Sequence, residues 1–67
     1  MGPYKKLKLK IKEVFDTQEE FAKAMNMSRT ALNLRLNEGV EWRMSEIVKA
    51  CELLGIPLKD AFQFFLV

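Results

Sequence analysis

Residues that begin or end helices recur along the whole of this 67-residue chain, and they limit each helix to a few turns. Thr17 stands three residues before a glutamate, the spacing of a capping box that satisfies free N–H groups at a helix start. Ser28 is a favourable N-cap, and Asn26 just before it tolerates the left-handed conformation of a helix end. Gly55 and Pro57 then separate a fourth helix from a fifth. The pattern predicts five short helices, and hence an all-α bundle.

The lysine-rich segment KKLKLKIK, residues 5–12, alternates charged and apolar residues as a half-buried strand does. The adjacent apolar pair at positions 14 and 15 breaks this alternation, and no turn-linked second strand follows to pair with it. A helical spacing places more of the apolar residues on one face, with Leu9 alone on the wrong side. The residues of that face are Tyr4, Leu7, Ile11, Val14 and Phe15. The segment is therefore expected to be a helix.

The later helices show the same helical spacing of apolar residues. We expect Leu32 and Leu36 to face inward from the third helix, and the fifth helix to run from Leu58 to about Phe65. The expected inward residues of the fourth helix are Met44, Ile47, Val48, Cys51 and Leu54. Those of the fifth helix are Leu58, Ala61, Phe62 and Phe65.

The chain lacks the residues on which most enzymes and metal sites depend. It has no histidine, and its single cysteine, Cys51, cannot build a zinc site of the usual ligand count. Cys51 falls on the apolar face of the fourth helix, which favours a buried thiol over a nucleophile. No glycine-rich phosphate loop and no apolar run of membrane-spanning length is present. We expect a non-enzymatic cytoplasmic protein without a metal, a cofactor or a small-molecule ligand.

Charge is distributed unevenly along the chain. Residues 1–12 carry five lysines and no acid, so +5, whereas residues 13–67 carry six basic and nine acidic side chains, so −3. A basic arm on a mildly acidic body indicates a localised anionic partner. A solvated helix face is the other interpretation, and charge alone leaves both open.

The segment TQEEFAKAMNMSRTALNLRLNEG, Thr17 to Gly39, resembles the helix-turn-helix of the lambda-repressor-like family, which includes Cro and phage repressors. The matching features are a threonine-glutamine start, Ala22 in the first helix, a three-residue turn and an Asn-x-Gly-type exit. The tail SEIVKACELLGIPLKDAF resembles the fourth and fifth helices of that family. Two departures are Asn26, where the family usually has glycine, and an inward Leu36 one place later than in many members. The resemblance implies a compact five-helix lambda-repressor-like bundle, with residues 1–67 as a single domain.

The resemblance also implies that the helix from Ser28 to Asn37 enters the major groove of operator DNA. Its outer side offers arginine, asparagine and methyl-bearing groups that can contact base edges. The expected base-reading residues are Arg29, Thr30, Asn33 and Leu34. The expected phosphate contacts are Gln18, Ser28, Arg35, Asn37, Arg43, Lys5 and Lys6. A plainer interpretation, in which the arginines are solvated and Leu34 is a single exposed leucine, stays open.

These expectations lead to a DNA-binding transcriptional regulator of phage or prophage type, whose partner is double-stranded operator DNA. One recognition helix covers few base pairs, so useful specificity implies a two-fold dimer on a near-palindromic site. The alternative is a protein-interaction module of the same fold, such as an antitoxin half or an antirepressor. The negative charge of residues 13–67 and the small number of arginines, three in all, favour this alternative.

The carboxyl end, AFQFFLV, is more apolar than a monomer of this size should expose. With the inward positions of the last helix assigned, three apolar residues are left for other faces: Phe64, Leu66 and Val67. Exposed apolar patches commonly mark interfaces, so we expect a weak homodimer through this segment. The other interpretation is that these residues fold back and cap the core.

Overall fold

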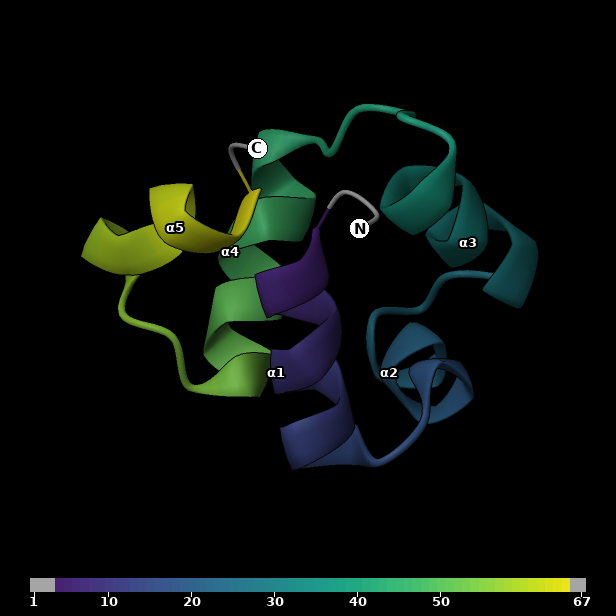
Figure 1. Ribbon diagram of the computed structural model, residues 1–67, viewed down its shortest axis with the longest axis horizontal. Helices are drawn as coiled ribbons and strands as arrows, with labels where there is room; N and C mark the ends of the chain where they lie inside the picture. Colours follow the sequence, from purple (N-terminus) through teal and green to yellow (C-terminus); the bar gives the residue numbers. More distant parts are fainter. Residues whose placement is uncertain (1–3, 66–67) are drawn as a thin grey trace.

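The computed structural model describes residues 4–65, and this part of the chain is helical with no strand. The elements are α1 (Lys5–Phe15), α2 (Gln18–Ala24), α3 (Arg29–Asn37), α4 (Met44–Leu54), a 3-10 turn η1 (Leu58–Asp60) and α5 (Ala61–Phe65). Figure 1 shows α1 and α4 together at the centre, with α2 and α3 on one side of them and α5 on the other. The predicted all-α architecture of five helices is confirmed.

The helix ends form largely as their residues predict. The hydroxyl of Thr17 accepts a hydrogen bond from the backbone N–H of Glu20 at 3.1 Å, and that of Ser28 accepts from Ala31 at 3.0 Å. Asn26 has a φ of 60°, the left-handed conformation expected where the chain leaves α2. These local contacts fix where α2 and α3 begin, and so they set the turn between the two helices.

The link between α1 and α2 is tighter than the sequence indicates. Asp16 has φ 71° and ψ −47°, and the N–H of Thr17 donates to the carbonyl of Phe15 at 2.8 Å. This geometry is that of a γ-turn, which is rare for a residue with a side chain. The turn lets α2 fold back against α1, and it brings the rings of Phe15 and Phe21 to a centroid distance of 5.4 Å.

One core, shared by all five helices, holds the molecule together. Its largest fully buried side chains are Phe21, Leu7, Ile11, Leu32 and Leu36. Around it, Trp42 in the loop before α4 packs edge-on against Tyr4 and Phe65, with centroid distances of 6.3 and 5.1 Å. The aromatic contacts therefore join the loop before α4 to both ends of the described chain.

Two residues expected in the core, one on α1 and one on α4, are exposed. Val14 is 45% exposed because Phe15, rather than Val14, turns toward Phe21 at the end of α1. Met44, the first residue of α4, is 71% exposed.

The carboxyl-terminal helix differs most from the prediction. Residues 58–60 form a 3-10 turn, so the regular helix is short and only Ala61 and Phe65 reach the core. Leu58 and Phe62, both predicted to be buried, are exposed. Phe64, predicted to be a surface residue of a dimer interface, is half-buried against the core. Leu66 and Val67, the other two predicted interface residues, lie outside the described residues.

Candidate interaction surfaces

The outer face of α3 presents the four predicted base-reading residues together. Arg29, Thr30, Asn33 and Leu34 are all exposed. On the opposite side of the helix Leu32 and Leu36 are completely buried. The helix is thus rotated as the leucine spacing predicts, with its polar side available to a partner.

A chain of hydrogen bonds connects this face to α1. The Asn37 amide donates to the side-chain oxygen of Asn33 at 2.7 Å, and Lys8 donates to Asn37 at 2.6 Å. At the other end of α3, Arg29 donates to Gln18 at 3.4 Å. These bonds therefore gather four predicted site residues on one surface together with Lys8: Gln18, Arg29, Asn33 and Asn37. That lysine was not among the predicted residues, although its spacing from Lys5 already put both on one side of α1.

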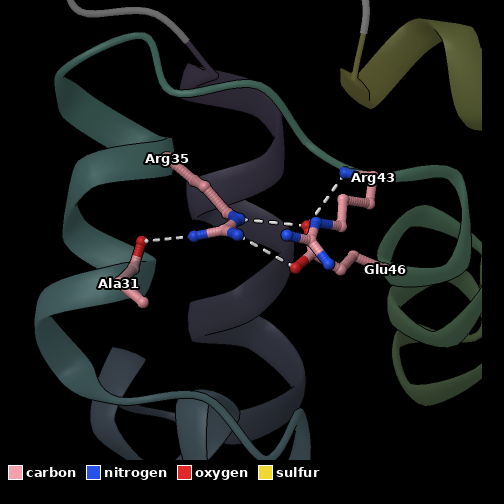
Figure 2. A network of polar contacts seen from close by, with 4 residues as sticks. All are labelled: Ala31, Arg35, Arg43 and Glu46. Carbon is pink, nitrogen blue, oxygen red and sulfur yellow. Dashed lines mark hydrogen bonds and ion pairs between the residues drawn. The ribbon is translucent and has the colours of Figure 1, made fainter.

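The side chain of Arg35 is bonded to protein atoms of α3 and α4 (Figure 2). Its Nε and Nη2 atoms donate to the two carboxylate oxygens of Glu46 on α4, each at 3.0 Å, and Nη1 donates to the carbonyl of Ala31 at 3.1 Å. The Arg35 side chain is only 14% exposed. Three of the five N–H donors of Arg35 thus bind protein atoms, which disfavours the predicted phosphate contact, and that contact stays a prediction.

Glu46 has two partners in this arrangement. One oxygen also accepts from the backbone N–H of Arg43 at 2.9 Å, which caps the start of α4. Burial opposes the charge, but the Arg43 N–H and the Arg35 guanidinium outweigh it, so the pKa of Glu46 is lowered. One sequence signal indicates the cap contact with Arg43, since Glu46 occupies the third position of α4, where acidic residues commonly reach back to cap a helix.

The remaining predicted phosphate contacts are not on one surface. Ser28 uses its hydroxyl to cap α3, and Arg43 is exposed at the start of α4. Lys6 turns toward α5, where it donates to Gln63 at 3.0 Å and lies 5.4 Å from the centre of the Phe64 ring. Lys5 and Lys6 are predicted to contact phosphates together. The two side chains lie apart, because Lys5 lines a hollow that borders α2 whereas Lys6 contacts α5.

An apolar hollow of about 330 Å³ lies between α4 and α5. We call it the α4–α5 hollow; its lining residues are Met44, Ile47, Leu58, Ala61, Phe62 and Phe65. At its edge Phe62 is 71% exposed and Leu58 is 57% exposed. This surface is not predicted by the sequence, because the helical spacing of its residues indicates the core for these same side chains.

A second hollow, of about 380 Å³, runs along the outer side of α1 and reaches the start of α2. We call it the α1 hollow; its lining residues are Lys5, Lys8, Leu9, Ile11, Lys12, Asp16 and Gln18. It is predominantly basic, in contrast to the apolar α4–α5 hollow.

Within residues 4–65 no group of three or more potential ligands from histidine, cysteine, aspartate and glutamate could hold a metal ion. Cys51 is buried, and burial raises the pKa of its thiol. None of the helices described is long and apolar enough to cross a membrane.

Comparison with known proteins identifies a family across nearly the whole chain. Residues 2–67 match the model of DUF739, a family described as proteins of unknown function. The chain belongs to this family. The family identified is thus DUF739, and the likeness of the motif to the lambda-repressor-like family stays a resemblance.

A solved structure is similar to this DUF739 protein over 96% of the chain. It is the solution structure of the modulator of repression of the temperate bacteriophage TP901-1 from Lactococcus lactis. The two sequences are 38% identical, the TM-score is 0.83, and 86% of the phage protein is covered. A comparison with curated proteins finds no match.

Proposed function

We propose that this protein is a small phage or prophage regulator that binds a repressor protein and thereby modulates repression. The similarity to a modulator of repression supports this role, since it extends over 96% of the chain at 38% identity. A regulator of this kind needs a surface that binds another protein, and it does not need to read DNA itself.

The observation that carries the proposal is the α4–α5 hollow. Phe62, Leu58 and Met44 are exposed around one cavity, where they do not stabilise the fold by burial. Grouped apolar side chains of this kind mark protein interfaces. Covering one such side chain completely is worth about 1.5–3 kcal/mol. All its lining side chains are apolar and the ring of Phe62 is exposed among them, which suits an apolar anchor residue at the centre of an interface.

The hollow is also separate from the outer face of α3. Figure 1 shows α5 and α3 on opposite sides of the central helices. A repressor bound at the α4–α5 hollow would therefore leave α3 uncovered.

Sequence-specific DNA binding through α3 is the second candidate function. The exposed row of Arg29, Thr30 and Asn33 favours it, because these side chains can bond base edges in a major groove. It is the weaker candidate because Arg35 is held by Glu46, which leaves Arg29 as the one arginine on the exposed face of α3. In this candidate function the protein would act as a homodimer, for which Phe64, Leu66 and Val67 remain the proposed contacts.

Calorimetric titration with the repressor encoded by the same phage tests the proposed function. The wild-type chain should bind the repressor, and Phe62→Ser should weaken the affinity at least tenfold because it removes the exposed ring at the hollow. Val14→Ser is the matched control, since Val14 is also an exposed apolar residue but lies on α1. An affinity unchanged by Phe62→Ser, or reduced equally by Val14→Ser, would show that the repressor does not bind at this hollow.

A further inference from the structure

Leu9 is an apolar residue with no role in the fold. It is 61% exposed on the outer side of α1, where it lines the α1 hollow among lysines. The helical pattern of α1 does not require it, because Leu7 and Ile11 already provide the buried contacts of this helix. A leucine exposed within a charged hollow indicates a ligand that has an apolar group of its own.

Three lysines surround this leucine along one side of the helix. Lys5, Lys8 and Lys12 are separated by three and four residues, so their stems project from neighbouring turns and span roughly 10 Å at 1.5 Å per residue. In the described part of the chain none of them forms an ion pair, and Lys8 bonds only the neutral side chain of Asn37. By contrast, Lys10, also on α1, is paired with Glu13 at 3.0 Å.

The charge of the hollow is therefore free to act on a ligand. Asp16, at the end of the hollow next to α2, is the single acidic residue in its lining, so three lysines and one aspartate leave a formal charge of +2. Gln18 adds a neutral polar group beside it. A ligand with two or three carboxylates placed about an apolar side chain would match both the charge and the leucine.

We propose that the α1 hollow binds an acidic segment of a partner protein, with one apolar side chain of that segment packed on Leu9. Its carboxylates would bind Lys5 and Lys12 on either side of this contact. A DNA backbone offers anionic phosphates and only the carbons of its sugars as apolar atoms, whereas a polypeptide can place a whole apolar side chain on Leu9, which is why a polypeptide fits better. The site shares no residue with the α4–α5 hollow, so this inference does not depend on the proposed function.

The probe is a fluorescein-labelled peptide with the sequence Glu-Glu-Leu-Glu-Glu flanked by glycines. In an extended peptide, residues three apart span about 10 Å, which matches the lysine spacing. Fluorescence anisotropy should show binding by the wild-type chain that weakens as sodium chloride is raised from 50 to 300 mM. Peptides with glutamine in place of glutamate, or serine in place of leucine, should each bind at least tenfold more weakly.

Variants of the chain locate the binding. The double change Lys5→Gln with Lys12→Gln should weaken peptide binding at least tenfold, whereas Lys49→Gln with Lys59→Gln, the same loss of charge at other exposed lysines, should not. Leu9→Ser should weaken binding of the leucine peptide and leave that of the serine peptide unchanged. All five residues are exposed, so the variants should keep the wild-type circular dichroism spectrum and melting temperature.

Several results would overturn the inference. No binding of the peptide by wild type, or equal losses in the two double-lysine variants, would remove the basis for this site. A 20-base-pair duplex that competes with the peptide and depends on Lys5 and Lys12, but not on Leu9, would identify the hollow as a DNA contact instead. Self-association in sedimentation that the Lys5 and Lys12 changes abolish would point to a second copy, whose Glu38 and Glu41 flank an exposed valine.

Discussion

At the scale of single residues, the pair formed by Arg35 and Glu46 has the most consequence. Two parallel N–H···O bonds at 3.0 Å join α3 to α4, and both side chains are largely covered. Bidentate pairs of this type fix geometry as well as supply energy. Arg35 therefore holds α3 against α4, with three of its five N–H donors bound to protein atoms.

The first prediction concerns the stability that Glu46 provides. Glu46→Gln should lower the free energy of unfolding at pH 7 by about 2 kcal/mol, because hydrogen bonds to charged groups contribute more than neutral ones. The folded-state pKa of Glu46 lies below its ordinary value of 4.5, so its stabilisation is present above that value and is lost as pH falls through the lowered pKa. Urea unfolding of both proteins between pH 7 and pH 2.5 measures the difference.

Glu52→Gln, an exposed glutamate on the same helix, is the control and should change stability little at any pH. A difference between wild type and Glu46→Gln that persists undiminished at pH 2.5 would contradict the assigned role of the charge.

At the scale of helices, α3 is built so that one side is core and the other is available. Leu36 is completely buried, whereas Leu34, two residues earlier, is 39% exposed. Comparing the same substitution at these two leucines gives a direct test of the orientation of α3.

The second prediction uses this pair. Leu36→Ala should lower the free energy of unfolding by about 2–5 kcal/mol, since it leaves a cavity in the core. Leu34→Ala should cost roughly 0.5 kcal/mol or less, as for other surface changes. Chemical denaturation monitored by the fluorescence of Trp42 measures both, and equal costs would mean that α3 is rotated differently.

The sequence predicts the helices whose ends are set by local contacts. Thr17, Ser28, Asn26 and Gly55 act within a few residues of themselves, and each does at its helix end what its residue type predicts. The exception is the return contact from the glutamate of the first capping box, because the N–H of Thr17 instead bonds the carbonyl of Phe15.

The sequence does not predict contacts that depend on packing between distant elements. The apolar spacing of residues 58–65 is compatible with a full helix, but the 3-10 turn changes which side chains reach α1 and α4. Phe62 and Phe64 exchange their expected environments for this reason. Likewise, nothing in the sequence near Arg35 shows that its partner is Glu46, eleven residues later.

At the scale of the whole molecule, a small domain carries surfaces of different chemistry on different sides. Its described part is about 28 × 22 × 22 Å, and α5, which lines the apolar α4–α5 hollow, lies on the opposite side of the central helices from α3. The basic surface is already indicated in the sequence by the lysines of residues 1–12, whereas the apolar surface forms only in the fold. In the proposed function the protein binds a repressor at the α4–α5 hollow and does not use the helix that its sequence marks for DNA.

Chemical-shift mapping of the ¹⁵N-labelled chain tests most directly whether this molecule acts through a protein partner. Addition of the repressor from the same phage should shift the backbone amides of Ile47, Ala61 and Phe62 in a saturable way and leave those of Thr30 and Asn33 nearly unchanged. Addition of that phage's operator duplex alone should produce no saturable shifts on α3. Saturable shifts of Arg29 to Asn37 with the duplex, together with no response of the α4–α5 hollow to the repressor, would contradict this account.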